Sequence, residues 1–174
     1  MEDKVTVSQV GLKNGIILGL IFIVYSMILQ FLNLEMKMMQ YFGYVSYVIL
    51  IIFIVLAHKS FKAGNDGFMT VGQGLGTGML ISVVAGVINA VFSYIYIKFI
   101  DDSMLQKIAD AQLEQYEKMG MDDDAIEQAM EMSSKFMTPE MIQVWAIIGM
   151  LFIGFILSLI VSLFTKKANP ALDV

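Results

Sequence analysis

The chain has no cysteine, no arginine and a single histidine among its 174 residues. Without cysteine it can form no disulfide, thiolate metal site or thiol chemistry. Without arginine it lacks the planar, bidentate side chain that suits phosphate, which argues against a nucleic-acid partner. The one histidine, His58, stands beside Lys59 with no acid–base or metal-binding partner near it in the sequence. From the sequence we therefore assign no catalytic residue, no metal and no cofactor.

Apolar residues, in contrast, are in excess. They make up 57% of the chain, and the mean hydropathy is +0.73, whereas a soluble domain is about 45–50% apolar. The charged residues are unevenly spread, because 12 of the 16 acidic residues are Glu35 or lie between positions 101 and 140. This composition indicates a membrane protein with one acidic segment.

Four long runs carry no charged residue: 15–34, 38–57, 71–97 and 142–164. About 20 apolar residues cross roughly 30 Å of hydrocarbon as a helix, and a soluble domain of this size could not enclose four such runs. The first run exceeds the usual signal-peptide core of about 7–15 residues and no cleavage site follows, so we expect it to be retained. The sequence predicts an all-α protein with four transmembrane helices in a single membrane domain, 1–174.

Lysine positions predict the orientation, since lysines beside membrane spans favour the cytoplasmic side. One end of the predicted bundle would carry Lys4, Lys13, Lys59, Lys62, Lys166 and Lys167. The other end would carry Lys37, Lys98 and the loop lysines Lys107, Lys118 and Lys135. We expect both termini in the cytoplasm and the acidic segment outside.

Small residues at a spacing of four predict how the helices pack, because small side chains let membrane helices approach closely. The third run contains Gly74, Gly78, Ser82, Gly86 and Ala90; the first contains Gly11, Gly15 and Gly19; the fourth contains Gly154, Ser158 and Ser162. We expect the third helix to be central, with Asn89 available for a hydrogen bond to a neighbouring helix and Val84 facing lipid. A phosphate loop is disfavoured, since Met79 and Leu80 follow the last glycine of 72–78 where Lys and Ser/Thr are needed.

The acidic segment 101–141 shows helical periodicity twice, which predicts an extramembrane acidic helical hairpin between the third and fourth spans. We expect Ser103 and Gln106 to form a capping box and Gly120 to end the first helix. The aspartates at 122–124 suit the start of a second helix. Thr138 and Pro139 are typical of the start of the fourth span. The aspartate run does not follow an EF-hand pattern, so helix capping explains it better than metal binding.

Four stretches together resemble a known family. They are FMTVGQGLGTGMLISVVAGVINAVFSYIYIKFIDD from Phe68, YEKMGMDDDAIEQAMEM, TPEM and the closing LIVSLFTKK. The chain is similar over nearly its whole length to domain-of-unknown-function family 4199. The resemblance implies a small four-span protein of the inner membrane of Gram-negative bacteria, with no assigned activity or functional residues. It also implies a gene neighbourhood that points to envelope metabolism.

Three functional interpretations remain open. The first is a non-enzymatic membrane component that lies in the lipid bilayer and binds a membrane-protein partner or forms a homo-oligomer. The second is a small oligomeric carrier or channel for an uncharged solute, with Gln30, Asn33 and Asn89 along the path. The third is an enzyme, for which the sequence offers no nucleophile–base pair. A hydrated cavity that crosses the bundle would favour the second interpretation over the first.

Overall fold

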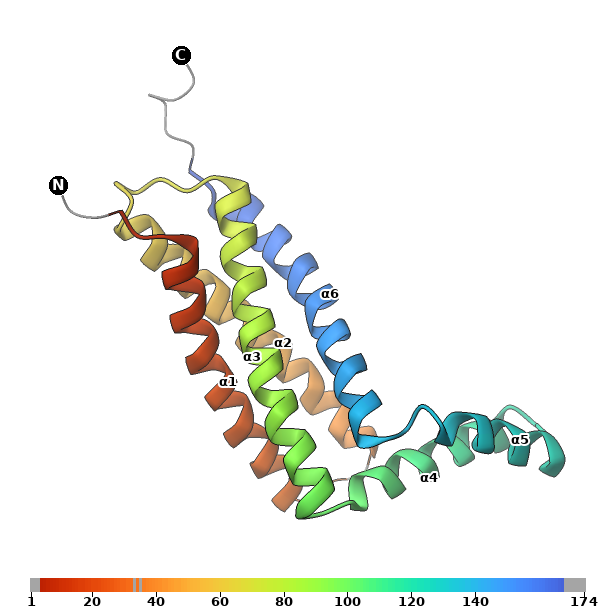
Figure 1. Ribbon diagram of the computed structural model, residues 1–174. Helices are drawn as coiled ribbons and strands as arrows, with labels where there is room; N and C mark the ends of the chain where they lie inside the picture. The colour runs from red at the N-terminus through yellow and green to blue at the C-terminus, as the bar shows by residue number, and fades with distance from the viewer. Residues whose placement is uncertain (1–3, 33, 35, 168–174) are drawn as a thin grey trace.

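A computed structural model describes residues 4–32, 34 and 36–167. These residues form six helices in chain order: α1 (Val7–Phe31), α2 (Met36–Ala63), α3 (Val71–Phe99), α4 (Ser103–Lys118), α5 (Asp123–Ser134) and α6 (Pro139–Thr165). Four of them, α1, α2, α3 and α6, are long and apolar enough to cross a membrane. The predicted all-α, four-span fold is therefore confirmed. The long helices pack side by side, and α4 and α5 extend from one end (Figure 1).

The spanning helices are longer than the uncharged runs that predicted them. Helix α1 begins at Val7 rather than near position 15, because Thr6 and Gln9 form a capping box in which each side chain bonds the other's backbone N–H. Thr70 and Gln73 begin α3 in the same way. Helix α2 continues to Ala63, so that His58, Lys59 and Lys62 belong to its last turns.

The expected starts of α4 and α6 had different outcomes. The capping box at Ser103 and Gln106 was wrong: Asp102 is the N-cap, and the backbone N–H of Ser103 donates to Asp101 Oδ1. The prediction for α6 is confirmed, since Thr138 accepts from the N–H of Met141 and Pro139 is the first helical residue. Gly120 follows α4 with a φ of 74°, a conformation that glycine adopts without strain.

The end of the bundle that holds both termini is tied together by backbone hydrogen bonds. Met69 and Lys167 form an antiparallel bridge with two N–H···O bonds of 2.9 Å, which joins the start of α3 to the end of α6. The Asn65 side chain donates to the carbonyls of Val5 and Phe61. Asp66 and Gly67, with φ of 54° and 82°, make the turn between α2 and α3.

The buried core lies mostly in the half of the bundle near the termini. Its apolar residues are Val10, Leu18, Phe22, Leu50, Ile54, Ala57, Phe61, Met69, Ile81, Ala85 and Val161. Large apolar side chains on the outer faces of α1, α2, α3 and α6 are exposed. In a membrane these outer faces would contact lipid, which explains why they are as apolar as the buried core.

Candidate functional site

Helix α3 packs against α6 through reciprocal contacts between small residues. A Cβ atom on Gly74 would overlap Ser162, one on Gly78 would overlap Ser158, and one on Gly154 of α6 would overlap Ser82. Gly86 meets the longer side chain of Met150, with 3.1 Å from the ideal Cβ position to Met150 Cγ. The two helices are therefore closest between Gly78 and Gly154, toward the middle of the contact, and the contact is looser at Gly86.

Helix α1 packs against the other side of α3 with the roles reversed. Its glycines Gly11, Gly15 and Gly19 lie against the large side chains Leu80, Val84 and Ile88 of α3, respectively. The expectation that Val84 faces lipid was wrong, because its Cβ would be 2.8 Å from a Cβ on Gly15. The pattern of small residues on α3 could not reveal this second face, since there the glycines are on the partner helix.

Helix α2 packs less tightly against the bundle in its first half. Where its burial is described, its buried residues, from Leu50 to Phe61, lie in the second half. In the half of the bundle nearer α4, the four long helices line a partly open cavity of about 230 Å³, whose lining includes Tyr25, Ser46, Asn89 and Met150. A neighbouring cavity of about 250 Å³ also has Ser26 and Leu29 in its lining. It continues to Gln30 of α1 and to Met104 of α4.

Asn89 is the polar residue of α3 in this cavity. Its Oδ1 atom is buried and has no hydrogen-bond partner among the described residues, so this oxygen does not use the interhelical hydrogen bond for which the residue was available. Two other polar groups of the lining are engaged: Tyr25 donates to the carbonyl of Phe42 at 2.8 Å, and Ser26 to that of Ile23. Ala90, the last member of the predicted stripe, also lines the cavity.

The opposite half of the bundle is closed by His58, a residue to which the sequence assigned no role. Its side chain is fully buried, with Nδ1 2.7 Å from Thr165 Oγ1 and Nε2 2.9 Å from the carbonyl oxygen of Gly74. Lys62 caps the same point by donating to the carbonyl of Thr165 at 2.9 Å. The imidazole thus joins α2, α3 and α6. These partners are 16 and 107 residues away in the chain, so no local pattern could identify them.

The geometry restricts how His58 hydrogen-bonds. A carbonyl oxygen can only accept, so Nε2 carries the proton that it donates to Gly74. The Thr165 Oγ1 atom lies 2.7 Å from Nδ1 of His58 and 2.8 Å from the carbonyl oxygen of Val161, so its one proton can go to either. A neutral imidazole therefore requires the hydroxyl to donate to Nδ1, which gives His58 a structural role as a hydrogen-bonded connector between helices.

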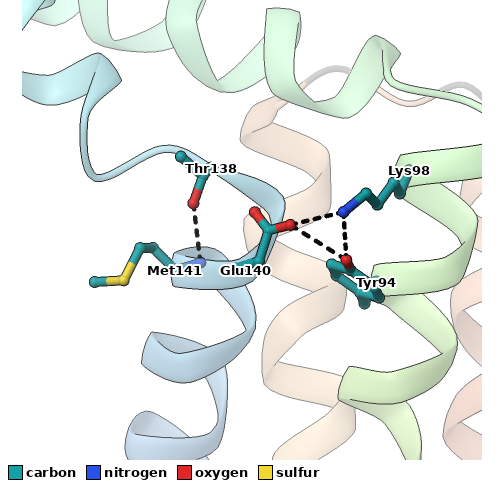
Figure 2. Close-up of polar contacts among 5 residues, drawn as sticks. All are labelled: Tyr94, Lys98, Thr138, Glu140 and Met141. Atoms are coloured by element: carbon teal, nitrogen blue, oxygen red, sulfur yellow. Dashed lines mark hydrogen bonds and ion pairs between the residues drawn. The ribbon is translucent and has the colours of Figure 1, made fainter.

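At the end of the bundle near α4, a small charged cluster joins α3 to α6 (Figure 2). Lys98 Nζ lies 2.9 Å from Glu140 Oε1 and 2.5 Å from the Tyr94 hydroxyl, which itself donates to Glu140 at 3.2 Å. The ammonium also lies 4.9 Å from the centre of the Tyr94 ring. The side chains of Lys98 and Glu140 are 43% and 53% exposed. The cluster therefore lies at the surface of the bundle, where it links the end of α3 to the start of α6.

We call residues 101–138, which include α4 and α5, the acidic arm. Ser133 of α5 donates to Gln112 of α4 at 2.6 Å, and neither helix has a buried residue. The N–H of Ser103 holds the pKa of Asp101 below its usual value, and a hydrogen bond from Lys118 does the same for the pKa of Glu114. Both carboxylates are thus charged at neutral pH, and the arm keeps its negative charge. Among the described residues no group of three or more His, Cys, Asp or Glu could hold a metal ion.

In the comparison with protein families, a family model matches residues 13–167 and is described as "Protein of unknown function (DUF4199)". The chain belongs to this family. No protein with a curated description and no solved structure matches it. The DUF4199 protein is thus a multi-pass membrane protein of unknown function. A more specific function has to be inferred from the structure of this chain.

Proposed function

We propose that this DUF4199 protein is a non-enzymatic component of the bacterial inner membrane that assembles with a second membrane protein through its acidic arm. The observation that carries this proposal is that α4 and α5 are amphipathic yet bury no residue. Met119, Met132 and Phe136 of the arm are 68%, 66% and 55% exposed. A partner that covered these apolar side chains would remove them from water, which is favourable.

The length and charge of the arm indicate what kind of partner would cover it. Helices of 16 and 12 residues are marginal alone in water, so the arm gains stability from whatever packs on it. Its acidic surface would be repelled by anionic lipid headgroups. A protein surface with lysine or arginine around an apolar centre would complement it in both charge and polarity. With both termini in the cytoplasm, as the lysine positions favour, that surface lies on the outer side of the membrane.

Affinity purification in mild detergent, followed by mass spectrometry, tests the proposal. The informative variant replaces three exposed apolar residues of the arm: Met119→Ser, Met132→Ser and Phe136→Ser. The matched control replaces two exposed polar residues of the same arm, Gln115→Ser in α4 and Gln128→Ser in α5. We expect a protein that copurifies stoichiometrically with the wild type and the control and is lost from the triple variant. Equal recovery with the triple variant, or no stoichiometric protein at all, would refute a partner at the arm.

A small carrier for an uncharged solute is the second candidate, and the cavity between α1, α2, α3 and α6 favours it. None of the described residues that line the cavity near Asn89 is charged, and Gln30 lines its neighbour toward α4. Asn33, which we expected on the same path, lies outside the described residues. The other half is closed at His58 and by the α3–α6 contacts, so transport would need a second conformation. Uptake of radiolabelled glycerol by proteoliposomes tests this candidate, and uptake no faster than in protein-free liposomes would count against it.

A further inference from the structure

Three lysines from α2 and α6 lie together at the end of the bundle that holds the termini. Lys62 Nζ donates to the carbonyl oxygen of Thr165 at 2.9 Å, which brings this ammonium group to the peptide unit that also contains the nitrogen of Lys166. Lys59 precedes Lys62 by three residues on α2, a spacing at which side chains on a helix are neighbours. We call Lys59, Lys62 and Lys166 the lysine cluster.

The charge of the lysine cluster is not neutralised within the described part of the protein. Lys59 and Lys166 are exposed, and among the described residues neither forms an ion pair. Asp66 is the one acidic residue that the structure describes at this end, and it lies 3.8 Å from Lys4. The other described acidic residues lie between positions 101 and 140, toward the opposite end. Three ammonium groups without a counter-charge create a positive potential, which attracts an anion.

Exposed apolar side chains continue from the lysine cluster toward the middle of the bundle. Ile52 and Leu56 of α2 are 50% and 49% exposed and lie seven and three residues before Lys59, on the same side of the helix. On α6, Leu163 and Phe164 are exposed in the last turn. Because these apolar faces contact the hydrocarbon of the membrane, the ammonium groups lie at the level of the lipid headgroups. The surface therefore matches a molecule with an anionic head and hydrocarbon chains.

We infer that the lysine cluster binds the headgroup phosphate of an anionic phospholipid, whose acyl chains lie along the exposed apolar face of α2. Clusters of basic side chains between membrane helices are suited to such headgroups. A free phosphate ion would offer the charge without the chains and would leave the apolar face uncovered. Since Lys59 and Lys166 come from different helices, the lipid joins the ends of α2 and α6. This site does not depend on the partner proposed for the acidic arm, because the two lie at opposite ends of the bundle (Figure 1).

Native mass spectrometry of the purified full-length protein tests this site. The probe is dioleoyl phosphatidylglycerol, and dioleoyl phosphatidylcholine is the control lipid, which has the same chains and no net charge. We expect phosphatidylglycerol to bind saturably and to raise the melting temperature in detergent, since a ligand of the folded protein stabilises it. Glycerophosphate, the soluble headgroup, should not displace it. Equal binding of the two lipids, or displacement by glycerophosphate, would overturn the inference.

Variants separate binding by the lysine cluster from the general charge of this end. Lys59→Gln combined with Lys166→Gln should bind phosphatidylglycerol about 25-fold more weakly, because each lysine near an anionic lipid contributes about fivefold. Its melting temperature without lipid should not change, and Lys59→Arg combined with Lys166→Arg should retain binding. The matched control, Lys4→Gln with Lys13→Gln, removes the same charge from α1 and the residues before it. If both glutamine variants weaken binding equally, the overall charge attracts the lipid, and the inference is wrong.

Discussion

Gly78 of α3 lies directly against Ser158 of α6, with no space for a Cβ atom between them. Gly78→Ala should therefore force the helices apart and lower the free energy of unfolding by about 1–3 kcal/mol. Gly86→Ala is the matched variant, because Gly86 faces only the flexible side chain of Met150, and we expect a change within about 0.5 kcal/mol. Thermal unfolding in detergent compares the two. Equal losses would show that the α3–α6 contact is as tight at Gly86 as at Gly78.

Val84 of α3 fits against Gly15 of α1, so its size should matter although valine and leucine are both apolar. Val84→Leu should lower stability by about 1 kcal/mol or more, since overpacked sites typically lose about 1–3 kcal/mol. Val87, also on α3, is 42% exposed, and Val87→Leu should leave the melting temperature unchanged. Thermal unfolding in detergent compares Val84→Leu with Val87→Leu. A neutral Val84→Leu would mean that α1 moves away from α3 at little cost.

His58 connects three spanning helices, so its loss should weaken the closed half of the bundle. His58→Leu removes both hydrogen bonds of the imidazole and should cost about 1–3 kcal/mol. Ser60→Ala is the control, because Ser60 is exposed on the same helix turn. Stability is measured by thermal unfolding, and cysteine crosslinking between α2 and α6 would report whether the helices separate. If both variants behave as the wild type does, His58 contributes nothing to holding the helices together.

Lys98 and Glu140 form an exposed ion pair, which salt should weaken. Lys98→Gln and Glu140→Gln should each lower the melting temperature slightly, and the double variant should lose little more than either single one. The difference from the wild type should shrink at about 1 M salt, where the screening length falls to about 3 Å. Differences that persist at high salt would assign the effect to the Tyr94 contacts instead.

The expected orientation can be tested directly because the natural chain has no cysteine. Single cysteines at Ser8 and Ser60 should resist a membrane-impermeant thiol reagent in cells with a permeabilised outer membrane, and one at Gln128 should react. All three positions are exposed. Gly64 is unsuitable for this purpose, because a side chain there would collide with Val5. The reverse labelling pattern would invert the topology and place the acidic arm in the cytoplasm.

The main features of the fold follow from local signals. Uncharged runs of about 20 residues can only be membrane spans in a chain of this size, and Gly120 and Thr138 mark helix ends through interactions within a few residues. The spacing of Gly74, Gly78 and Ser82 likewise pointed to α3 as a packing surface. Where a local signal was misread, as at Ser103, a competing side chain two residues away, that of Asp101, had taken the same backbone N–H.

The sequence by itself determined that the chain spans a membrane four times and belongs to a family without known function, because hydrophobicity and helix caps act over short distances. Tertiary structure alone decided the partners of His58, the contact of Val84 with Gly15 and the cavity around Asn89. Each depends on how far two helices, distant in sequence, approach one another. That distance is set by side chains on both helices at once, and a pattern along one helix records only half of it.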